Sequence, residues 1–139
     1  MLEKNWPNFS KSLISKVGKV LSLGKINYTN GPYGRKFEKE FSRFVGNKYS
    51  IAVCNGTAAL EVAIKSLKLP INSEILVTGR SFFSSASCIV NTGHIPNFVD
   101  VNLQTQNISL KDIKKKISKK TRAIICVHLA GLPCDMKNI

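Results

Sequence analysis

Short apolar runs alternate with stretches of helical spacing from Tyr49 onward, and this alternation restricts the fold more than any other feature of the sequence. The runs cover residues 51–54, 74–78, 95–101 and 122–128. Several are apolar at consecutive positions, which is typical of parallel strands covered by helices on both faces. The stretches between them predict helices over residues 58–69, 84–91 and 109–117. The pattern therefore predicts an α/β domain with a mainly parallel sheet.

The residues before Tyr49 predict helices and a loop, without strands. Residues 11–23 and 35–45 place apolar side chains at helical spacing, and each stretch ends at a glycine. Between them lies KINYTNGPYG, residues 25–34, whose Gly, Asn and Pro content predicts a loop. We therefore expect two parts, a helical segment with its loop over residues 1–48 and the α/β part over residues 49–139.

The net charge of +13 raises the question of nucleic-acid binding. Lysines are dense only between Lys111 and Lys120, and Ser109 and Asp112 have the spacing of a capping box for a helix there. Charge on a helix face turned away from the core explains this run better than a binding patch. A basic module that binds nucleic acid remains the alternative from a different functional class.

The four cysteines predict buried, reduced thiols and a cytoplasmic protein. No Cys-x-x-Cys pair occurs, and three of the cysteines lie inside apolar runs. Cys134 and His128, or Cys88 and His94, lack the paired spacing of a zinc site, so no metal is expected. No apolar stretch reaches 18 residues, so no membrane association is expected.

The stretch YSIAVCNGTAALEVAI, residues 49–64, joins an apolar run to a helical pattern through Asn55, Gly56 and Thr57. The first turn of a helix presents unpaired N–H groups and the positive end of the helix dipole, and both favour an anion. The same residue types are also good helix caps without any ligand. The spacing matches neither Gly-x-Gly-x-x-Gly nor the Walker pattern, so a nucleotide-binding fingerprint is not supported.

A second candidate segment, GRSFFSSASCI, follows the run at 74–78 directly. Ligands of parallel α/β sheets gather beyond the carboxyl ends of the strands. Phe82 and Phe83 could stack on a planar ring there, although such a pair more often covers the core.

Four blocks of the sequence together resemble the DegT/DnrJ/EryC1/StrS family of pyridoxal-phosphate-dependent sugar aminotransferases. The blocks are YTNGPYGRKFEKEF, YSIAVCNGTAALEVAIKSL, SFFSSASCIVNTGHIPNFVDV and TRAIICVHLAGLPCDM, and they occur in the family's order. The resemblance implies the three-layer fold of aspartate aminotransferase, known as fold type I. It also implies that residues 49–139 are the first part of an incomplete, cofactor-binding large domain.

The resemblance assigns cofactor contacts residue by residue. Gly56, Thr57 and Ala58 would hold the 5′-phosphate through backbone N–H groups and the Thr57 hydroxyl. Phe82 would stack on the pyridine ring, and Phe83 would then belong to the core. His128 would lie beside the cofactor.

Asn30, Gly31 and Pro32 match the family's amino-terminal loop, which is often near the active site at a dimer interface. Asn30 stands where threonine is common, and Cys134 stands where alanine is more usual.

The family's catalytic residues lie downstream of Ile139, so no catalytic residue is assigned in this chain. These residues are the aspartate that pairs with the pyridine nitrogen and the lysine that binds the cofactor covalently. We expect the 139-residue chain to be an amino-terminal fragment that is inactive alone.

The resemblance implies the reaction, the substrates and the assembly. The full-length protein would be a homodimer that transfers an amino group, with glutamate as the donor, to a nucleotide-linked keto-sugar in polysaccharide or glycan precursor synthesis. A sugar dehydratase of the same family, with histidine in place of the lysine, is the alternative within the family.

Overall fold

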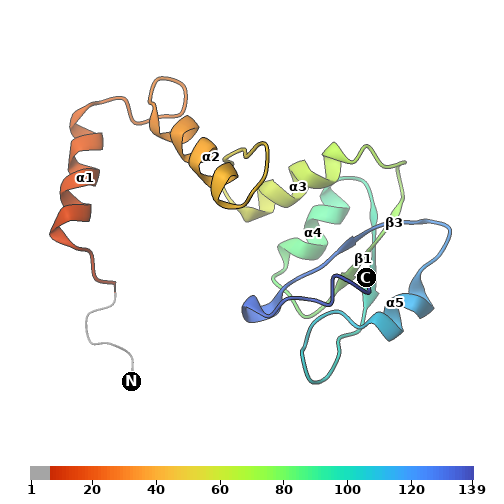
Figure 1. The fold of residues 1–139 in the computed structure, drawn as a ribbon. Coiled ribbons are helices and arrows are strands. Elements are labelled where there is room, and N and C mark those ends of the chain that lie inside the picture. Colours follow the sequence, from red (N-terminus) through yellow and green to blue (C-terminus); the bar gives the residue numbers. More distant parts are fainter. Residues whose placement is uncertain (1–6) are drawn as a thin grey trace. The chain divides into compact units, whose positions relative to one another are not determined.

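The chain divides into two compact units, residues 1–52 and residues 53–139. Figure 1 labels the helices and strands that they contain. The computed structural model describes residues 7–139. The roles predicted for the two parts, an interface segment and the beginning of a cofactor-binding domain, stay predictions.

The first unit contains two helices, α1 (Lys11–Ser22) and α2 (Tyr33–Phe44), and both were predicted. The hydroxyl oxygen of Ser10 accepts a hydrogen bond from the Leu13 N–H at 3.2 Å and so caps α1. The carboxylate of Glu38 on α2 accepts hydrogen bonds from the Tyr28 hydroxyl at 2.9 Å and from the Ala52 N–H at 2.8 Å. Glu38 thus ties the segments before and after α2 to that helix.

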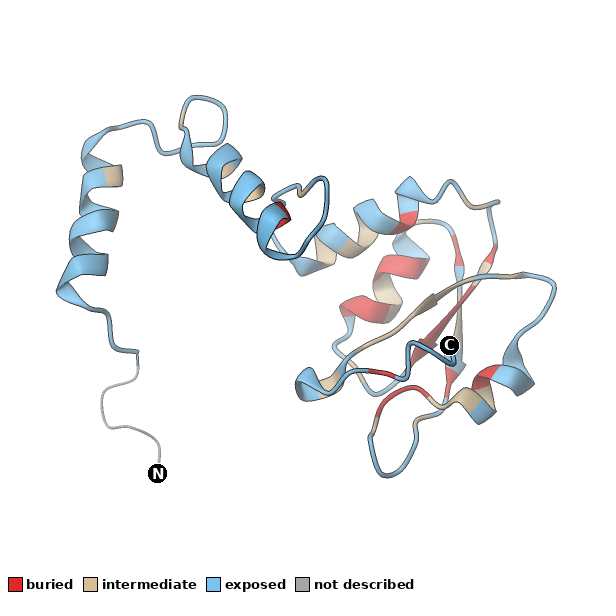
Figure 2. Ribbon diagram, in the orientation of Figure 1, coloured by how far each residue is buried: buried red, intermediate tan, exposed pale blue. Residues whose placement is uncertain are grey.

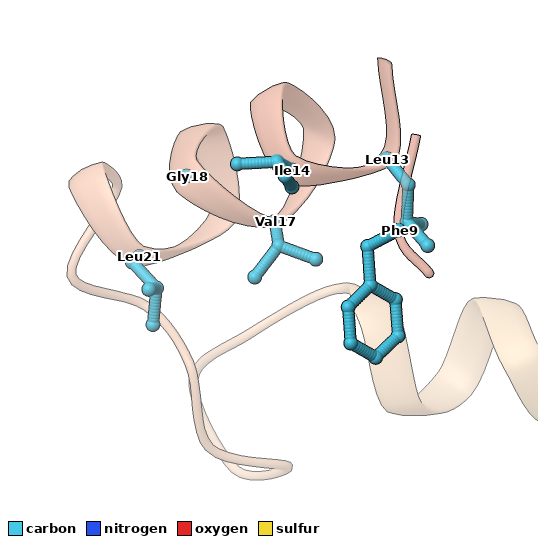
Figure 3. Close-up of a pocket in the computed structure, with 6 residues that line it drawn as sticks. All are labelled: Phe9, Leu13, Ile14, Val17, Gly18 and Leu21. Atoms are coloured by element: carbon cyan, nitrogen blue, oxygen red, sulfur yellow. The ribbon is translucent and has the colours of Figure 1, made fainter. Parts of the chain in front are cut away.

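The apolar side chains of α1 remain exposed. Figure 3 shows Phe9, Val17 and Leu21 extending on the same side of the helix. Together with Leu13, Ile14 and Gly18 they line an apolar depression. The predicted helical stripe is therefore present, but the described residues of its unit do not bury it.

The second unit is the predicted α/β domain with a parallel sheet. Its elements in chain order are α3 (Gly56–Ser66), β1 (Glu74–Thr78), α4 (Ser84–Asn91), β2 (Ile95–Val99), α5 (Leu110–Lys116), β3 (Thr121–Ile125) and a short 3₁₀ turn (Leu129–Gly131). The strands lie in the order β2-β1-β3, and both pairings are parallel. The predicted helices and three of the four predicted strands are confirmed.

The core lies on both faces of the central strand β1. On one face, Ile75 and Val77 pack with Ile64 of α3 and with Cys88 and Ile89 of α4. On the other face, Leu76 packs with Val99 of β2, Ile108 of the segment before α5, Ile113 of α5 and Cys134 near the end of the chain. Figure 2 shows buried residues along β1 and α4, which form the interior of this three-layer arrangement.

The prediction of a strand over residues 51–54 is wrong. This segment has no regular secondary structure, and Ile51 is 77% exposed. A short apolar run becomes a strand only where a neighbouring strand accepts and donates its backbone hydrogen bonds. Here the Ala52 N–H donates to the Glu38 carboxylate instead.

The prediction that the cysteines are buried, reduced thiols holds for Cys88 and Cys134 and is wrong for Cys54. All four are free, but Cys54 is exposed and Cys126 is half-buried. Cys54 is exposed because the predicted strand that would have buried it does not form. Burial raises the pKa of the Cys88 thiol, which keeps that thiol protonated and unreactive.

The predicted capping box at the start of α5 forms only in part. The Ser109 hydroxyl accepts from the Asp112 N–H at 3.4 Å, but the Asp112 carboxylate accepts from the Asp100 N–H at 2.8 Å. That bond, together with Lys116, lowers the pKa of Asp112. Asp112 therefore joins α5 to the segment that follows β2.

The lysine run of α5 surrounds one buried residue, Ile113, and its other residues lie nearer the surface. This arrangement agrees with the interpretation of the run as the solvated face of a helix, and the absence of a nucleic-acid partner stays a prediction. In the part of the chain that the structure describes, no helix has both the length and the hydropathy needed to cross a bilayer.

Truncation of Leu76 should destabilise the second unit strongly because this side chain is fully buried. We expect Leu76→Ala to lower the free energy of unfolding by about 2 to 5 kcal/mol. Leu103→Ala is the matched control, since Leu103 is 86% exposed, and its effect should stay within about 0.5 kcal/mol. Urea unfolding followed by circular dichroism measures both, and equal effects would contradict the description of the core.

Candidate functional site

Asn55 sets the start of α3 and the arrangement of its first N–H groups. Its backbone is extended, with φ of −165° and ψ of 173°, and its side-chain oxygen accepts from the Ala58 N–H at 2.9 Å. The Ala59 N–H donates to the Asn55 carbonyl at 3.1 Å. The N–H groups of Gly56 and Thr57 donate to no acceptor among the described residues. Two adjacent donors are thus available at the positive end of the helix.

Hydroxyl groups of α3 and α4 meet beside these donors. Thr57 Oγ1 donates to Ser84 Oγ at 2.8 Å, which joins the starts of the two helices. Ser81 and Ser85 form a second hydroxyl pair at 2.6 Å. The two pairs place four hydroxyl groups near the carboxyl end of β1, where a parallel sheet commonly binds its ligand.

An open groove of about 780 Å³ lies between α3 and the start of α4. Its lining consists of Asn55, Gly56, Thr57, Ala59, Leu60, Ala63, Phe82, Ser84 and Ser85. One end is formed by the polar groups at the helix starts, and the rest by small apolar side chains and the Phe82 ring. Such a groove suits a ligand with one anionic group and one flat apolar part.

Phe82 and Phe83 are both 79% exposed, and the prediction that Phe83 belongs to the core is wrong. The buried positions of α4 are Ser84, Ser85, Cys88 and Ile89, which recur at helical spacing. Phe83 precedes the helix and lies outside this buried stripe. Only Phe82 lines the groove.

The other residues predicted to contact the cofactor or to lie near the active site do not line this groove. Ala58 does not line the groove, and its N–H is already bonded to Asn55. His128 is exposed and its Nδ1 accepts from the Cys134 N–H at 3.0 Å. The loop of Asn30, Gly31 and Pro32 belongs to the first unit and lines a pocket of its own.

A phosphate group fits the polar end of the groove. A Cβ added at Gly56 would meet no atom within 4 Å, so the space beside this backbone is open to a ligand. The N–H groups of Gly56 and Thr57 and the Thr57 hydroxyl are the donors there. Among the described residues no cluster of metal-ligating side chains occurs.

The sequence did not reveal Ser84 and Ser85 as groove residues. Both lie in the segment SFFSSAS, but serines at the start of a helix are common caps and carry no signal of their own. They line the groove because α3 and α4 pack on the same face of β1.

Comparison with known proteins shows to which family the chain belongs. The sequence pattern of the DegT/DnrJ/EryC1/StrS aminotransferase family matches residues 8–139. The chain belongs to this family. The resemblance inferred from the four blocks is therefore confirmed, and so is the fold of type I.

Two curated relatives carry names from sugar chemistry. GDP-perosamine synthase of Escherichia coli O157:H7 is 40% identical over 111 residues, which are 80% of this chain and 30% of the relative. Spore coat polysaccharide biosynthesis protein SpsC of Bacillus subtilis is 35% identical over 133 residues, 96% of this chain and 34% of the relative. The chain thus spans about a third of the length of these relatives.

Solved structures show the same fold. An aminotransferase from Psychrobacter cryohalolentis has a TM-score of 0.90 and 42% identity, covering 96% of this chain and 34% of the other. NtdA from Bacillus subtilis, solved with the bound cofactor PMP, has a TM-score of 0.83 and 33% identity, covering 91% and 28%. PMP is the amino form of pyridoxal phosphate, so this neighbour agrees with the expected cofactor.

Removal of the Asn55 cap should weaken the start of α3. We expect Asn55→Ala to cost about 1 kcal/mol in the free energy of unfolding, because the Ala58 N–H loses its acceptor. Asn55→Asp is the control, since aspartate is an equally good cap, and it should stay near the wild type. Urea titrations of the three proteins test this, and equal stability of the alanine and aspartate variants would speak against the cap.

Proposed function

We propose that the protein carrying this chain is a pyridoxal-phosphate-dependent sugar aminotransferase that transfers the amino group of glutamate to a nucleotide-linked keto-sugar. The family match over residues 8–139 is the observation that carries this proposal. The groove at the start of α3 supports it, because its donors and its exposed aromatic ring suit a phosphate joined to a flat ring.

Gly56 and Thr57 are proposed to bind the 5′-phosphate of the cofactor. Their N–H groups donate to no acceptor among the residues that the structure describes, and the Thr57 hydroxyl can donate to a phosphate oxygen once it turns from Ser84 Oγ. The dipole of α3 adds to the attraction for the negative charge. The sequence also predicted a phosphate contact for the Ala58 N–H, but this group donates to the Asn55 side chain. It could bind the phosphate only if that hydrogen bond broke.

Phe82 is proposed to pack on the cofactor ring. It is the aromatic side chain of the groove, and it follows β1 at the edge of the sheet where ligands of parallel sheets bind. A ring held between an aromatic face and the protein is fixed in orientation and shielded from water on one side.

When bound, pyridoxal phosphate supplies an electron sink that stabilises negative charge at the carbon undergoing amino transfer. The residues of this chain anchor and orient that group. No residue of the chain is assigned to proton transfer or to covalent attachment, so we expect this part alone to be inactive.

The names of two relatives support the substrate class. One is a GDP-perosamine synthase, and the other takes part in spore coat polysaccharide biosynthesis. We therefore propose that the amino sugar made by this protein enters a polysaccharide or a related glycan. The homodimer that the family resemblance implies is likewise a proposal.

Loss of the proposed cofactor contacts should weaken cofactor retention. In the full-length protein, Thr57→Ala combined with Phe82→Ala should raise the dissociation constant of pyridoxal phosphate at least tenfold, which corresponds to about 1.4 kcal/mol. Phe83→Ala is the matched control, because Phe83 adjoins Phe82 and is equally exposed but lies outside the groove. Absorbance of the cofactor after dialysis measures retention. Equal retention by the double variant and the wild type would overturn the assignment.

Transfer of nitrogen from labelled glutamate tests the reaction. The full-length enzyme with cofactor, [¹⁵N]glutamate and a GDP-linked or UDP-linked 4-keto-sugar should yield a ¹⁵N-labelled amino sugar and 2-oxoglutarate. A deoxygenated sugar without the label would indicate the dehydratase. No turnover of any nucleotide-linked keto-sugar would contradict the proposed substrate class.

A further inference from the structure

A second polar pocket lies in the first unit, in the loop between α1 and α2. It has a volume of about 540 Å³, and its lining consists of Lys25, Thr29, Asn30, Gly31, Pro32 and Arg35. All of these residues come from one stretch of eleven positions, so the pocket is a property of the loop itself.

The loop is closely packed around Gly31. A Cβ at this position would lie 2.3 Å from the Lys25 carbonyl oxygen and 2.7 Å from that of Asn27, so only glycine fits. The Gly31 N–H donates to the Asn27 carbonyl at 2.9 Å, and the Asn27 side chain accepts from the Asn30 N–H at 3.0 Å. This packing brings the start of the loop, with Lys25, against its end.

Arg35 is held in place by an aromatic neighbour. Its guanidinium lies 5.9 Å from the centre of the Tyr28 ring, and the Tyr28 hydroxyl donates to Glu38. Arg35 forms no ion pair among the described residues. The nearby Glu38 carboxylate accepts from the Tyr28 hydroxyl and from the Ala52 N–H.

Four of the six residues that line this pocket have side chains that can donate hydrogen bonds, and none of the six is negatively charged. Lys25, Thr29, Asn30 and Arg35 have no side-chain hydrogen bond to another described residue. From Pro7 to Phe37 the sequence contains no aspartate or glutamate. The next acidic residue is Glu38, which does not line the pocket and whose carboxylate accepts from the Tyr28 hydroxyl and the Ala52 N–H. Two cations and two neutral donors in one lining are groups that bind a phosphate chain.

We infer that Lys25, Thr29, Asn30 and Arg35 form a binding site for the diphosphate group of the nucleotide-linked substrate. This inference rests on the proposed function, since a nucleotide-linked sugar carries a diphosphate and glutamate does not. The pocket shares no lining residue with the groove at α3, so the two sets of donors can be tested separately.

Nucleoside diphosphates serve as probes in calorimetric titrations of the full-length holoenzyme. GDP and UDP are compared with guanosine and uridine, which lack phosphate. Lys25→Gln and Arg35→Gln should each raise the dissociation constant of the preferred diphosphate about tenfold or more, since each removes a charge-assisted hydrogen bond. The cofactor absorbance of both variants should match that of the wild type.

Lys36→Gln is the matched control. Lys36 adjoins Arg35 on α2 and carries the same charge, but it lies outside the pocket and faces Glu40 at 3.8 Å. The dissociation constant of the preferred diphosphate should stay within twofold of the wild-type value in this variant. If Lys36→Gln lost as much affinity for the diphosphate as Lys25→Gln and Arg35→Gln, the overall positive charge of the segment alone would explain the binding. That result would overturn the proposed site.

The failure of this site differs from the failure of the proposed function. If the enzyme aminates a nucleotide-linked keto-sugar but Lys25→Gln and Arg35→Gln leave its KM and the diphosphate affinity unchanged, the site is wrong and the function stands. If diphosphate binding falls as expected but no keto-sugar is aminated, the site stands and the function is wrong. Absence of diphosphate binding by the wild type overturns the site.

Discussion

Burial of β1 on both faces is the constraint around which the second unit is arranged. Ile75, Leu76 and Val77 are fully inaccessible to solvent, and they alternate between a layer of α3 and α4 and a layer that includes α5. Such a strand requires parallel neighbours and helical cover on each side. Because α3 and α4 pack on the same face of β1, their first residues meet at its carboxyl end. The groove that we assign to the cofactor is a consequence of this packing.

The starts of these two helices give the groove its chemistry. Asn55 takes one N–H of α3, and the N–H groups of Gly56 and Thr57 remain for an anion. Phe82 then adds an aromatic surface to the lining of the groove. In our account, the groups that anchor and orient the cofactor therefore lie close together, at one end of β1 and the helices beside it. A chain that spans only about a third of the length of its relatives can for this reason contain this part of the site.

Much of the fold could be predicted because buried parallel strands and amphipathic helices leave strong periodic signals. Residues 51–54 gave the same apolar signal without forming a strand, since pairing depends on a neighbour that local sequence does not encode. Phe83 was misplaced for a related reason. Two adjacent phenylalanines look alike in the sequence, both are exposed, and only the structure shows that Phe82 lines the groove while Phe83 lies outside it. The hydrogen bond from the Ala58 N–H to the Asn55 side chain likewise could not be predicted from the sequence.

The central claim is that the start of α3 binds the cofactor phosphate. A crystal structure of the full-length protein with pyridoxal phosphate tests it most directly. Our account predicts phosphate oxygens within about 3 Å of the Gly56 and Thr57 backbone nitrogens and of the Thr57 hydroxyl, with the Phe82 ring against the pyridine. A phosphate bound away from α3, with Gly56 and Thr57 free of contact, would contradict it.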